Sequence, residues 1–295
     1  MAEKLFFKVP DKYDNVKAIN FLKGECKLSA RMITLLKREK NGILMDGKIL
    51  RTIDFVYCGK IVEINLPDEE ALLIEPVCGN LDIIYEDEHI LAVNKPANMP
   101  VHPVKQHRTD TLANIVAYYQ DENKQNFVFR AINRLDRDTS GIVIIAKNKY
   151  SANLLKNKVD KTYYAICHGK LTGEGTINEP IKLRDDSKMV RTISSDGLPS
   201  VTHYKSIAFN DKMSLIKLHL ETGRTHQIRC HMASLGHPLI GDDLYGGTLE
   251  YLPRQALHCK SVSFLHPINN RLIELDSEFP EDMKNLILQQ KLFDI

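Results

Sequence analysis

A chain of 295 residues, 43% of them hydrophobic, is long enough for one large and one small domain and can fill a core. No apolar run approaches the roughly 20 residues that cross a bilayer, and the first residues hold no apolar stretch long enough for a secretory signal, so we expect a cytoplasmic protein without a membrane segment. The net charge of +2 is weak for a nucleic-acid binder, so any such site must come from a local concentration of Lys and Arg.

Basic residues are concentrated between positions 27 and 51. Over Leu28–Lys37 a serine cap precedes apolar residues such as Ile33 and Leu36, which predicts an amphipathic helix with basic residues on its outer face. Two short apolar runs around an Asp-Gly pair in Gly42–Leu50 predict a β-hairpin, and Ile61–Ile64 predicts a further strand. This order of elements resembles the small RNA-binding module of ribosomal small-subunit protein four. The candidates for contact with RNA in it are Arg31, Lys37, Arg38 and Lys40.

An acidic cluster at 68–70 and the segment 76–80 interrupt the periodic pattern. We therefore expect the small RNA-binding module over residues 1–70, a linker over 71–80 and a larger domain over 81–295. A basic helix is also typical of an ordinary solvated surface, and the pattern alone leaves that alternative open.

Beyond residue 80, strands outnumber helices. Alternating apolar residues predict strands at 81–85, 90–93, 142–146, 163–167, 201–208, 214–220 and 257–264. Helical spacing predicts helices at 111–119, 150–157, 225–235 and 281–289. Thr225 would cap the third of these helices. Because the two kinds of element do not alternate regularly, we expect an α+β domain with a mixed, largely antiparallel central sheet and flanking helices, beside the small N-terminal α/β module.

The segment Asn133–Gly141, which reads NRLDRDTSG, is a polar turn directly before the apolar run Ile142–Ala146. Asp136 lies there between Arg134 and Arg137. Guanidinium groups on both sides can keep a partly buried carboxylate ionised, or bind phosphates beside it. A solvated network of ion pairs is equally compatible with this spacing.

Four segments, in the same order, resemble the signatures of the RluA-type RNA pseudouridine synthases. They are NKP at 94–96 with HP at 102–103, RLD at 134–136, KTYYA at 161–165, and GRTHQIRCH at 223–231, continued by GHPL at 236–239 and GDDLYG at 241–246. The likeness covers roughly residues 80–275. It implies the pseudouridine synthase fold, with a curved sheet and a cleft across it that receives RNA.

The resemblance also implies the chemistry. A uridine inside an RNA chain is detached at nitrogen, turned and rejoined to the ribose through carbon, without a cofactor. By the same resemblance Asp136 is the catalytic residue, Arg229 forms the ion pair that keeps it charged and placed, and Tyr163 offers a ring for stacking on the uracil and a hydroxyl near the reacting carbon. Because the target base must be flipped out of the stack, Arg134 is a candidate for filling the gap or gripping flanking phosphates. The other candidates for RNA contact in this domain are Lys95, His102, Arg224, His226 and Gln227.

Two positions depart from the family pattern: Asn133 stands where histidine is usual, and Asn98 stands where glycine is common. Asparagine donates and accepts hydrogen bonds as a neutral imidazole does, and it tolerates the left-handed backbone conformation as glycine does. Neither change therefore removes a required chemical group, although both unsettle the choice of substrate. We expect a monomer that acts on ribosomal RNA, with transfer RNA as the alternative substrate.

The sequence indicates no metal or nucleotide cofactor. His226 and His231 are five residues apart and so lie on different sides of a helix, the six cysteines form no CxxC pair, and there is no phosphate-binding glycine loop. The alternatives from other classes are a non-catalytic RNA-binding or ribosome-assembly protein that retains the fold, and an RNA base hydrolase in which Asp136 activates water. An intact Asp136, Tyr163 and Arg229 count against the first, and the lack of a second suitably placed acid counts against the second.

Overall fold

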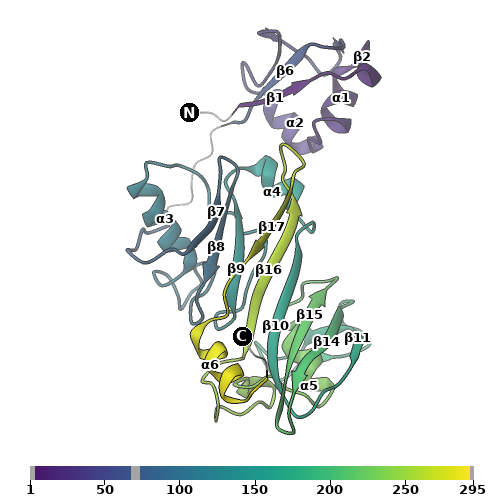
Figure 1. The fold of residues 1–295 in the computed structure, drawn as a ribbon. Coiled ribbons are helices and arrows are strands. Elements are labelled where there is room, and N and C mark those ends of the chain that lie inside the picture. Colours follow the sequence, from purple (N-terminus) through teal and green to yellow (C-terminus); the bar gives the residue numbers. More distant parts are fainter. Residues whose placement is uncertain (1–3, 68–73, 293–295) are drawn as a thin grey trace.

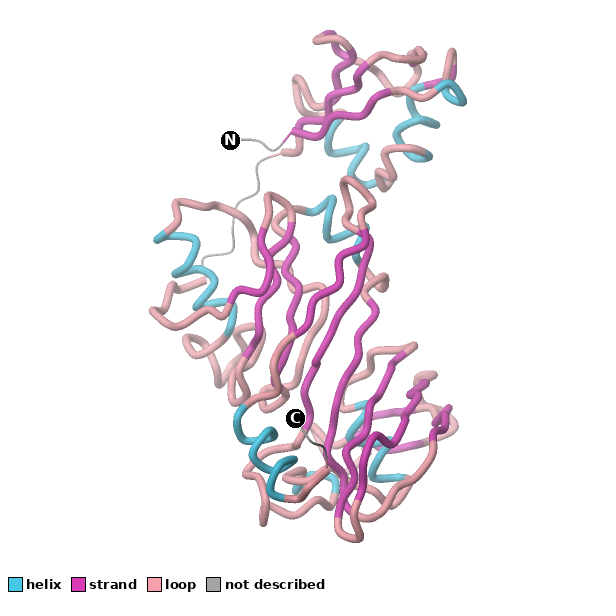
Figure 2. Tube along the Cα trace, viewed as in Figure 1, coloured by secondary structure: helices cyan, strands magenta, loops and turns pink. Residues whose placement is uncertain are grey.

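Strands form the centre of the molecule and helices lie along its margins (Figure 2). The computed structural model describes residues 4–67 and 74–292. A small N-terminal unit, residues 4–67, lies at one end of a long sheet built from the later residues (Figure 1). The expected linker over 71–80 lies partly outside the described residues. Within the described ranges, every helix is too short or too polar to span a bilayer.

The N-terminal unit contains the helix and the hairpin that the sequence predicts. Ser29 caps the helix, since its hydroxyl accepts a hydrogen bond of 3.2 Å from the Met32 N–H, and the hairpin turns at Asp46 and Gly47, both with positive φ. Its sheet runs β1-β6-β3-β4, and β2 pairs separately with β5. The elements are β1 (Lys4–Lys8), η1 (Asp11–Tyr13), β2 (Val16–Lys17), α1 (Ala18–Gly24), α2 (Ala30–Leu36), β3 (Ile43–Met45), β4 (Lys48–Ile49), β5 (Phe55–Val56) and β6 (Ile61–Asn65).

The large sheet runs β11-β14-β15-β10-β16-β9-β8-β7, with β17 paired to β16. Its strands are β7 (Ile83–Glu86), β8 (Ile90–Lys95), β9 (Ser140–Ala146), β10 (Asp160–His168), β11 (Glu174–Asn178), β14 (Val201–Phe209), β15 (Met213–Leu220), β16 (Leu257–Leu265) and β17 (Leu272–Asp276). The pairing of β16 with β9 is parallel and the other pairings within it are antiparallel, which confirms the mixed, largely antiparallel sheet.

The remaining elements lie around this sheet. They are α3 (Leu112–Glu122), α4 (Lys149–Leu155), the hairpin of β12 (Ile181–Leu183) and β13 (Arg191–Ile193), α5 (Gln227–Ser234), η2 (Asp243–Tyr245) and α6 (Glu281–Gln289). Successive residues of β10 belong to different apolar clusters: Ala165 packs in the cluster that contains α5, and Ile166 in the one that contains α6. Because side chains alternate along a strand, α5 and α6 cover opposite faces of the sheet.

The backbones of β9 and β16 approach closely where Gly141 pairs with Cys259. Gly141 has a φ of +114°, and a β-carbon on it would lie 2.3 Å from the carbonyl oxygen of Cys259. Only glycine fits this position. The turn that carries Asp136 is thereby fixed directly beside β16, on the parallel seam of the sheet.

The N-terminal unit has an apolar core of its own, which α4 completes. Phe21, Leu36 and Ile64 belong to this core, and Tyr150 of α4 joins them from the larger part of the chain. The rings of Phe7 and Tyr150 meet edge to face with their centroids 6.2 Å apart. The two parts of the molecule therefore share an apolar contact.

Candidate active site

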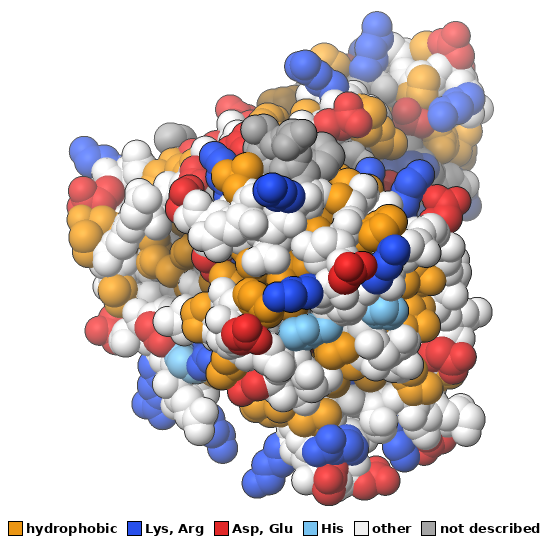
Figure 3. Space-filling view, turned by 60° about the horizontal axis from the view of Figure 1, so that its bottom comes forward, with side chains coloured by type: hydrophobic (Ala, Val, Ile, Leu, Met, Phe, Trp, Pro, Cys, Tyr) orange, Lys and Arg blue, Asp and Glu red, His pale blue; other side chains and the backbone are white. Residues whose placement is uncertain are grey.

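A cleft of about 980 Å³ crosses the large sheet near the Asp136 turn. A smaller recess of about 60 Å³ adjoins it, and the two share Asp136, Tyr163 and Arg224 as lining residues. Basic side chains line the cleft from several elements, among them Arg134, Arg137, Lys161 and Arg224. On the face in Figure 3, Lys and Arg side chains lie among Asp and Glu side chains and do not form one continuous basic surface.

The Asp136 side chain is 28% exposed and meets two nitrogen atoms through the same oxygen. Its Oδ2 lies 3.4 Å from Nη1 of Arg229 and 3.8 Å from Nε2 of His226. Neither neighbouring arginine pairs with Asp136. Arg137 makes two hydrogen bonds of 3.0 Å to Asp138 instead, and Arg134 is exposed on the wall of the cleft.

Arg229 is held mainly by a residue to which the sequence analysis gave no role. Asp242 accepts two hydrogen bonds of 2.7 Å, from Nε and Nη2 of Arg229, and its side chain is fully buried. The guanidinium also lies over the ring of Tyr245, 5.1 Å from the centroid. A bidentate pair and an aromatic platform fix the plane of the guanidinium, so Nη1 is left pointing at Asp136.

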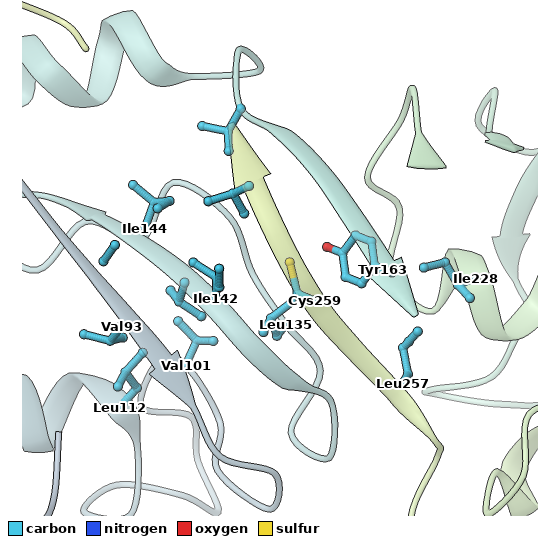
Figure 4. Packing of buried hydrophobic residues seen from close by; sticks show 14 of the residues in the cluster. Val93, Val101, Leu112, Leu135, Ile142, Ile144, Tyr163, Ile228, Leu257 and Cys259 are labelled. Carbon is cyan, nitrogen blue, oxygen red and sulfur yellow. The ribbon is translucent and has the colours of Figure 1, made fainter. Parts of the chain in front are cut away.

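Tyr163 lies on β10 and its ring lines the recess beside Asp136. Its hydroxyl points toward the thiol of Cys259 on β16 (Figure 4). Burial, together with this neighbour, raises the pKa of Tyr163 well above its usual range. The structure therefore presents the ring to the recess, while the expected hydroxyl near the reacting carbon faces the core instead.

His226 stands between the Asp136 turn and η2. Its Nδ1 lies 3.0 Å from the hydroxyl of Tyr245, and its backbone has the left-handed values φ 56° and ψ 20° directly before α5. The helix begins at Gln227, so the expected cap by Thr225 is wrong: His226 occupies the cap position and no side chain caps the helix. This conformation turns the His226 side chain toward the recess, which it lines.

Two residues that the sequence analysis expected to contact RNA make structural hydrogen bonds instead. Lys95 is fully buried, and its ammonium donates to the carbonyls of Pro96, Met99 and Arg137 at 2.7, 2.8 and 3.1 Å. Burial lowers its pKa to about 7. RNA cannot reach this group, and it ties the turn after Asp136 to the segment after β8.

The buried side chain of Gln227 is also fully engaged. It accepts hydrogen bonds from the Thr222 hydroxyl and the Arg224 N–H, and it donates to the Val201 carbonyl and the Thr202 hydroxyl. Gln227 therefore connects α5 to β14 and has no free group for RNA, although it lines the recess.

The other expected RNA contacts remain accessible. His102 lines the cleft and packs edge to face on Phe129, while Arg224 lines both cleft and recess. The basic residues of the N-terminal unit are exposed on α2 and just after it, and none of them lines the cleft: Arg31, Lys37, Arg38 and Lys40.

Asn133, at the first departure from the family pattern, is buried and its side chain is fully hydrogen-bonded to the backbone of β9. Its side chain donates to the carbonyl of Ile142 and accepts from the N–H of Ile144, both at 2.9 Å. The amide therefore clamps the start of the turn onto β9 through a donor and an acceptor. At the other departure, Asn98 has a φ of +58°, which confirms the expected left-handed turn.

Asn133→Ala is expected to lower the free energy of unfolding by about 2–4 kcal/mol, because it leaves one buried carbonyl and one buried N–H without a partner. Urea unfolding measures the loss. Asn123→Ala is the control, since that exposed amide donates only to the Tyr119 carbonyl, and its effect is expected within about 0.5 kcal/mol. Equal effects for the two variants would show that the Asn133 clamp does not stabilise the turn.

Asp242 and Tyr245 are the site residues that the sequence analysis did not single out. Both lie in GDDLYG, the segment quoted for its family resemblance, and nothing in their local pattern marks them as partners of Arg229. In residues 4–67 and 74–292, no group of three or more His, Cys, Asp or Glu side chains could hold a metal ion.

Known proteins are similar to this chain in both sequence and fold. The family model described as RNA pseudouridylate synthase matches residues 89–234. An uncharacterized RNA pseudouridine synthase of Bacillus subtilis, YhcT, is 47% identical over 236 residues, 77% of this chain and 78% of the relative. Ribosomal large subunit pseudouridine synthase D of Escherichia coli strain K12 is 34% identical over 265 residues, 83% of this chain and 81% of the relative. The solved structure of human RNA pseudouridylate synthase domain containing 4 shares the fold with a TM-score of 0.58, at 22% identity over 72% of this chain and 94% of that one. The chain therefore belongs to the RNA pseudouridylate synthase family and is an RNA pseudouridine synthase, an isomerase.

Proposed function

We propose that Asp136 is the catalytic carboxylate of this enzyme and that ribosomal RNA is its substrate. The observation that carries the first part is the geometry around Asp136: a partly exposed carboxylate lies in the recess of the cleft, and it faces an arginine locked by a buried partner, Asp242. A preorganised positive charge of this kind stabilises an ionised carboxylate without having to rearrange during the reaction.

The roles of the other residues follow from where their groups point. Arg229 holds Asp136 in place, and Tyr163 gives the uracil an aromatic surface within the recess. Arg134, exposed on the wall of the cleft, fills the space that the flipped nucleotide leaves or binds the neighbouring phosphates. An ionised Asp136 suits addition to the base and action at the sugar equally well. We also propose that the enzyme is a monomer.

Ribosomal RNA is favoured because relatives that cover more than two thirds of this chain are named ribosomal large subunit pseudouridine synthases. The test is to map pseudouridine across total RNA from cells with and without this protein. A uridine in ribosomal RNA that stays unmodified without the protein supports the proposal. If the only pseudouridine lost lies in transfer RNA, the substrate is transfer RNA and not ribosomal RNA. An unchanged map would contradict the proposal.

The N-terminal unit is proposed to be an RNA-binding module like that of ribosomal small-subunit protein four. Its predicted helix and hairpin are present as α2 and β3–β4, and the basic groups at Lys37, Arg38 and Lys40 are exposed. In the described residues no ion pair neutralises these three groups, whereas Lys4, Lys12 and Lys60 of the same unit are paired with carboxylates. Unpaired charges gathered at one end of a helix are the kind of surface that a phosphate backbone binds.

Replacing Lys37, Arg38 and Lys40 together by glutamine is expected to weaken RNA binding and to make the affinity less dependent on salt, because fewer counterions are released. Turnover at saturating RNA should change little, since these residues lie outside the cleft. Binding titrations at several salt concentrations give the slope.

The matched control replaces Lys4, Lys12 and Lys60 by glutamine, which removes the same charge from paired positions of the same unit. If both triple variants lose affinity equally, only the net charge of the unit matters. If the first variant keeps the parent's affinity and salt slope, the basic residues after α2 are merely solvated.

A further inference from the structure

His226 is wedged between the proposed catalytic carboxylate and a tyrosine. Its Nε2 lies 3.8 Å from Oδ2 of Asp136, and its Nδ1 lies 3.0 Å from the hydroxyl of Tyr245. The His226 and Tyr245 rings meet edge to face with centroids 5.7 Å apart, and the His226 side chain is only 13% exposed. The two ring nitrogens therefore have separate and fixed surroundings.

The surroundings of Tyr245 determine which nitrogen of His226 carries the proton. The backbone N–H of Arg191 donates to the Tyr245 hydroxyl at 2.8 Å, so the oxygen is an acceptor in that contact. Among the described residues, Nδ1 of His226 is the acceptor available for the hydroxyl's own hydrogen. A neutral imidazole that accepts at Nδ1 carries its hydrogen at Nε2, and that N–H faces Asp136.

The charged groups around His226 are consistent with a neutral ring. Burial lowers the pKa of His226, and the nearby Arg229 and Arg191 lower it further, while Asp136 and Asp242 act in the opposite direction. The net effect is a lowered pKa of His226. At neutral pH the ring therefore faces Asp136 as an N–H donor without a charge of its own.

Both donors in the recess approach the same oxygen of Asp136. Arg229 is 3.4 Å and His226 3.8 Å from Oδ2, and no described residue hydrogen-bonds to Oδ1. Arg229 hydrogen-bonds to this oxygen, and Nε2 of His226 lies just beyond hydrogen-bond distance of it, so both groups favour one rotation of the carboxylate about its χ2 bond, which is otherwise soft. They leave the other oxygen free for the substrate. Catalytic hydrogen bonds of this kind are commonly long in the free enzyme and shorten once substrate is bound.

The backbone of His226 is in the left-handed region, with a φ of 56°. Few residues with a β-carbon adopt this conformation, and asparagine, aspartate and histidine do so more readily than the others. Such conformations persist where the surrounding structure requires them, often at functional sites.

We propose that His226 is a positioning residue for Asp136: its Nε2–H, fixed in that tautomer by the Tyr245 hydroxyl, orients the carboxylate so that Oδ1 faces the uridine. The proposal rests on the proposed catalytic role of Asp136. It replaces the expectation that His226 binds RNA. The proposal also assigns a role to Tyr245. Its hydroxyl hydrogen-bonds to His226, and its ring lies against the guanidinium of Arg229.

Two substitutions at His226 separate this role from the alternatives. Glutamine places its amide nitrogen near the position of Nε2 and can still donate to Asp136, whereas asparagine is too short and reaches only the place of Nδ1. Asparagine, however, fits the left-handed backbone better. The positioning role therefore predicts that His226→Gln is the more active variant, and a purely conformational role predicts that His226→Asn is.

The experiment measures kcat and KM of both variants on an in vitro transcript of large-subunit ribosomal RNA. His226→Asn is expected to lower kcat by about 100-fold with KM changed less than about twofold, and His226→Gln to retain kcat within about tenfold of the parent. An equal or reversed loss overturns the proposal. A rise in KM for both variants at unchanged kcat also overturns it, in favour of RNA binding by His226.

Tyr245→Phe adds a second readout, because it removes the hydrogen bond that fixes the tautomer and keeps the ring beneath Arg229. We expect kcat to fall by roughly tenfold at unchanged RNA affinity, since part of the neutral His226 then carries its proton on Nδ1. Parent activity of Tyr245→Phe contradicts the tautomer argument. Asp136→Asn is measured in parallel: if it is active, the proposed function itself fails, and if it is inactive while His226→Asn equals the parent, only the role of His226 fails.

Discussion

Asp136→Asn is expected to abolish pseudouridine formation, to below about one thousandth of the parent rate, while RNA affinity stays within about twofold. The amide has nearly the shape of the carboxylate but cannot act as a charged nucleophile or base. The fold should be unaffected, because the main partner of Arg229 is Asp242 and the Asp136 side chain is partly exposed. Single-turnover formation of pseudouridine, followed by nuclease digestion and chromatography, gives the rate.

The control is Asp138→Asn, the same substitution two residues along the same turn. Asp138 pairs with the exposed Arg137 and contacts neither Arg229 nor His226. We expect its rate to stay within about threefold of the parent, because exposed ion pairs contribute little. A near-parent rate in Asp136→Asn would remove Asp136 from the chemistry, and equal losses in both variants would assign the effect to the structure of the turn.

Arg229→Met is expected to disable catalysis and also to destabilise the protein by about 3–5 kcal/mol, because it leaves the buried carboxylate of Asp242 without its partner. Loss of Nη1 also removes a donor from Asp136. Urea unfolding gives the stability, and the rate is measured where the variant is still folded.

The double variant Arg229→Met with Asp242→Asn separates the two effects. Removing the stranded charge should recover part of the stability, whereas the activity should not return. A stable double variant that regains the parent's rate would show that Arg229 only supports the fold.

The catalytic part of the fold was predictable because its strands are buried and strongly periodic. The run Ile142–Ala146 predicts a core strand. The observed strand β9 contains this run and begins two residues earlier, at Ser140. The strands that the analysis missed are short or face solvent. In β12–β13 and β17 much of the surface stays exposed, so no apolar alternation marks them.

The site was predictable only where one local segment carries the chemistry. Asp136 and Arg229 lie in recognisable motifs, but the pairing of Arg229 with Asp242 depends on how α5 and η2 pack, which no local pattern encodes. The same limit explains the errors at Lys95 and Gln227. A basic or amide side chain in a polar motif looks available to RNA, and only the tertiary structure shows that backbone groups already occupy it.

The position of β16 in the sheet has a consequence for how this enzyme is made. Residues 257–265 lie between β9 and β10, so the half of the sheet that carries the Asp136 turn is joined to the half that carries Tyr163 through a strand that follows both of them in the sequence. A ribosome that has released the first 250 residues has already supplied Asp136, Tyr163, Arg229 and Asp242, yet the two halves still lack the strand that bridges them. The active site can therefore form only after residues 257–265 have been made, and residues 1–256 alone hold every proposed catalytic group without the strand that joins the two halves of the sheet.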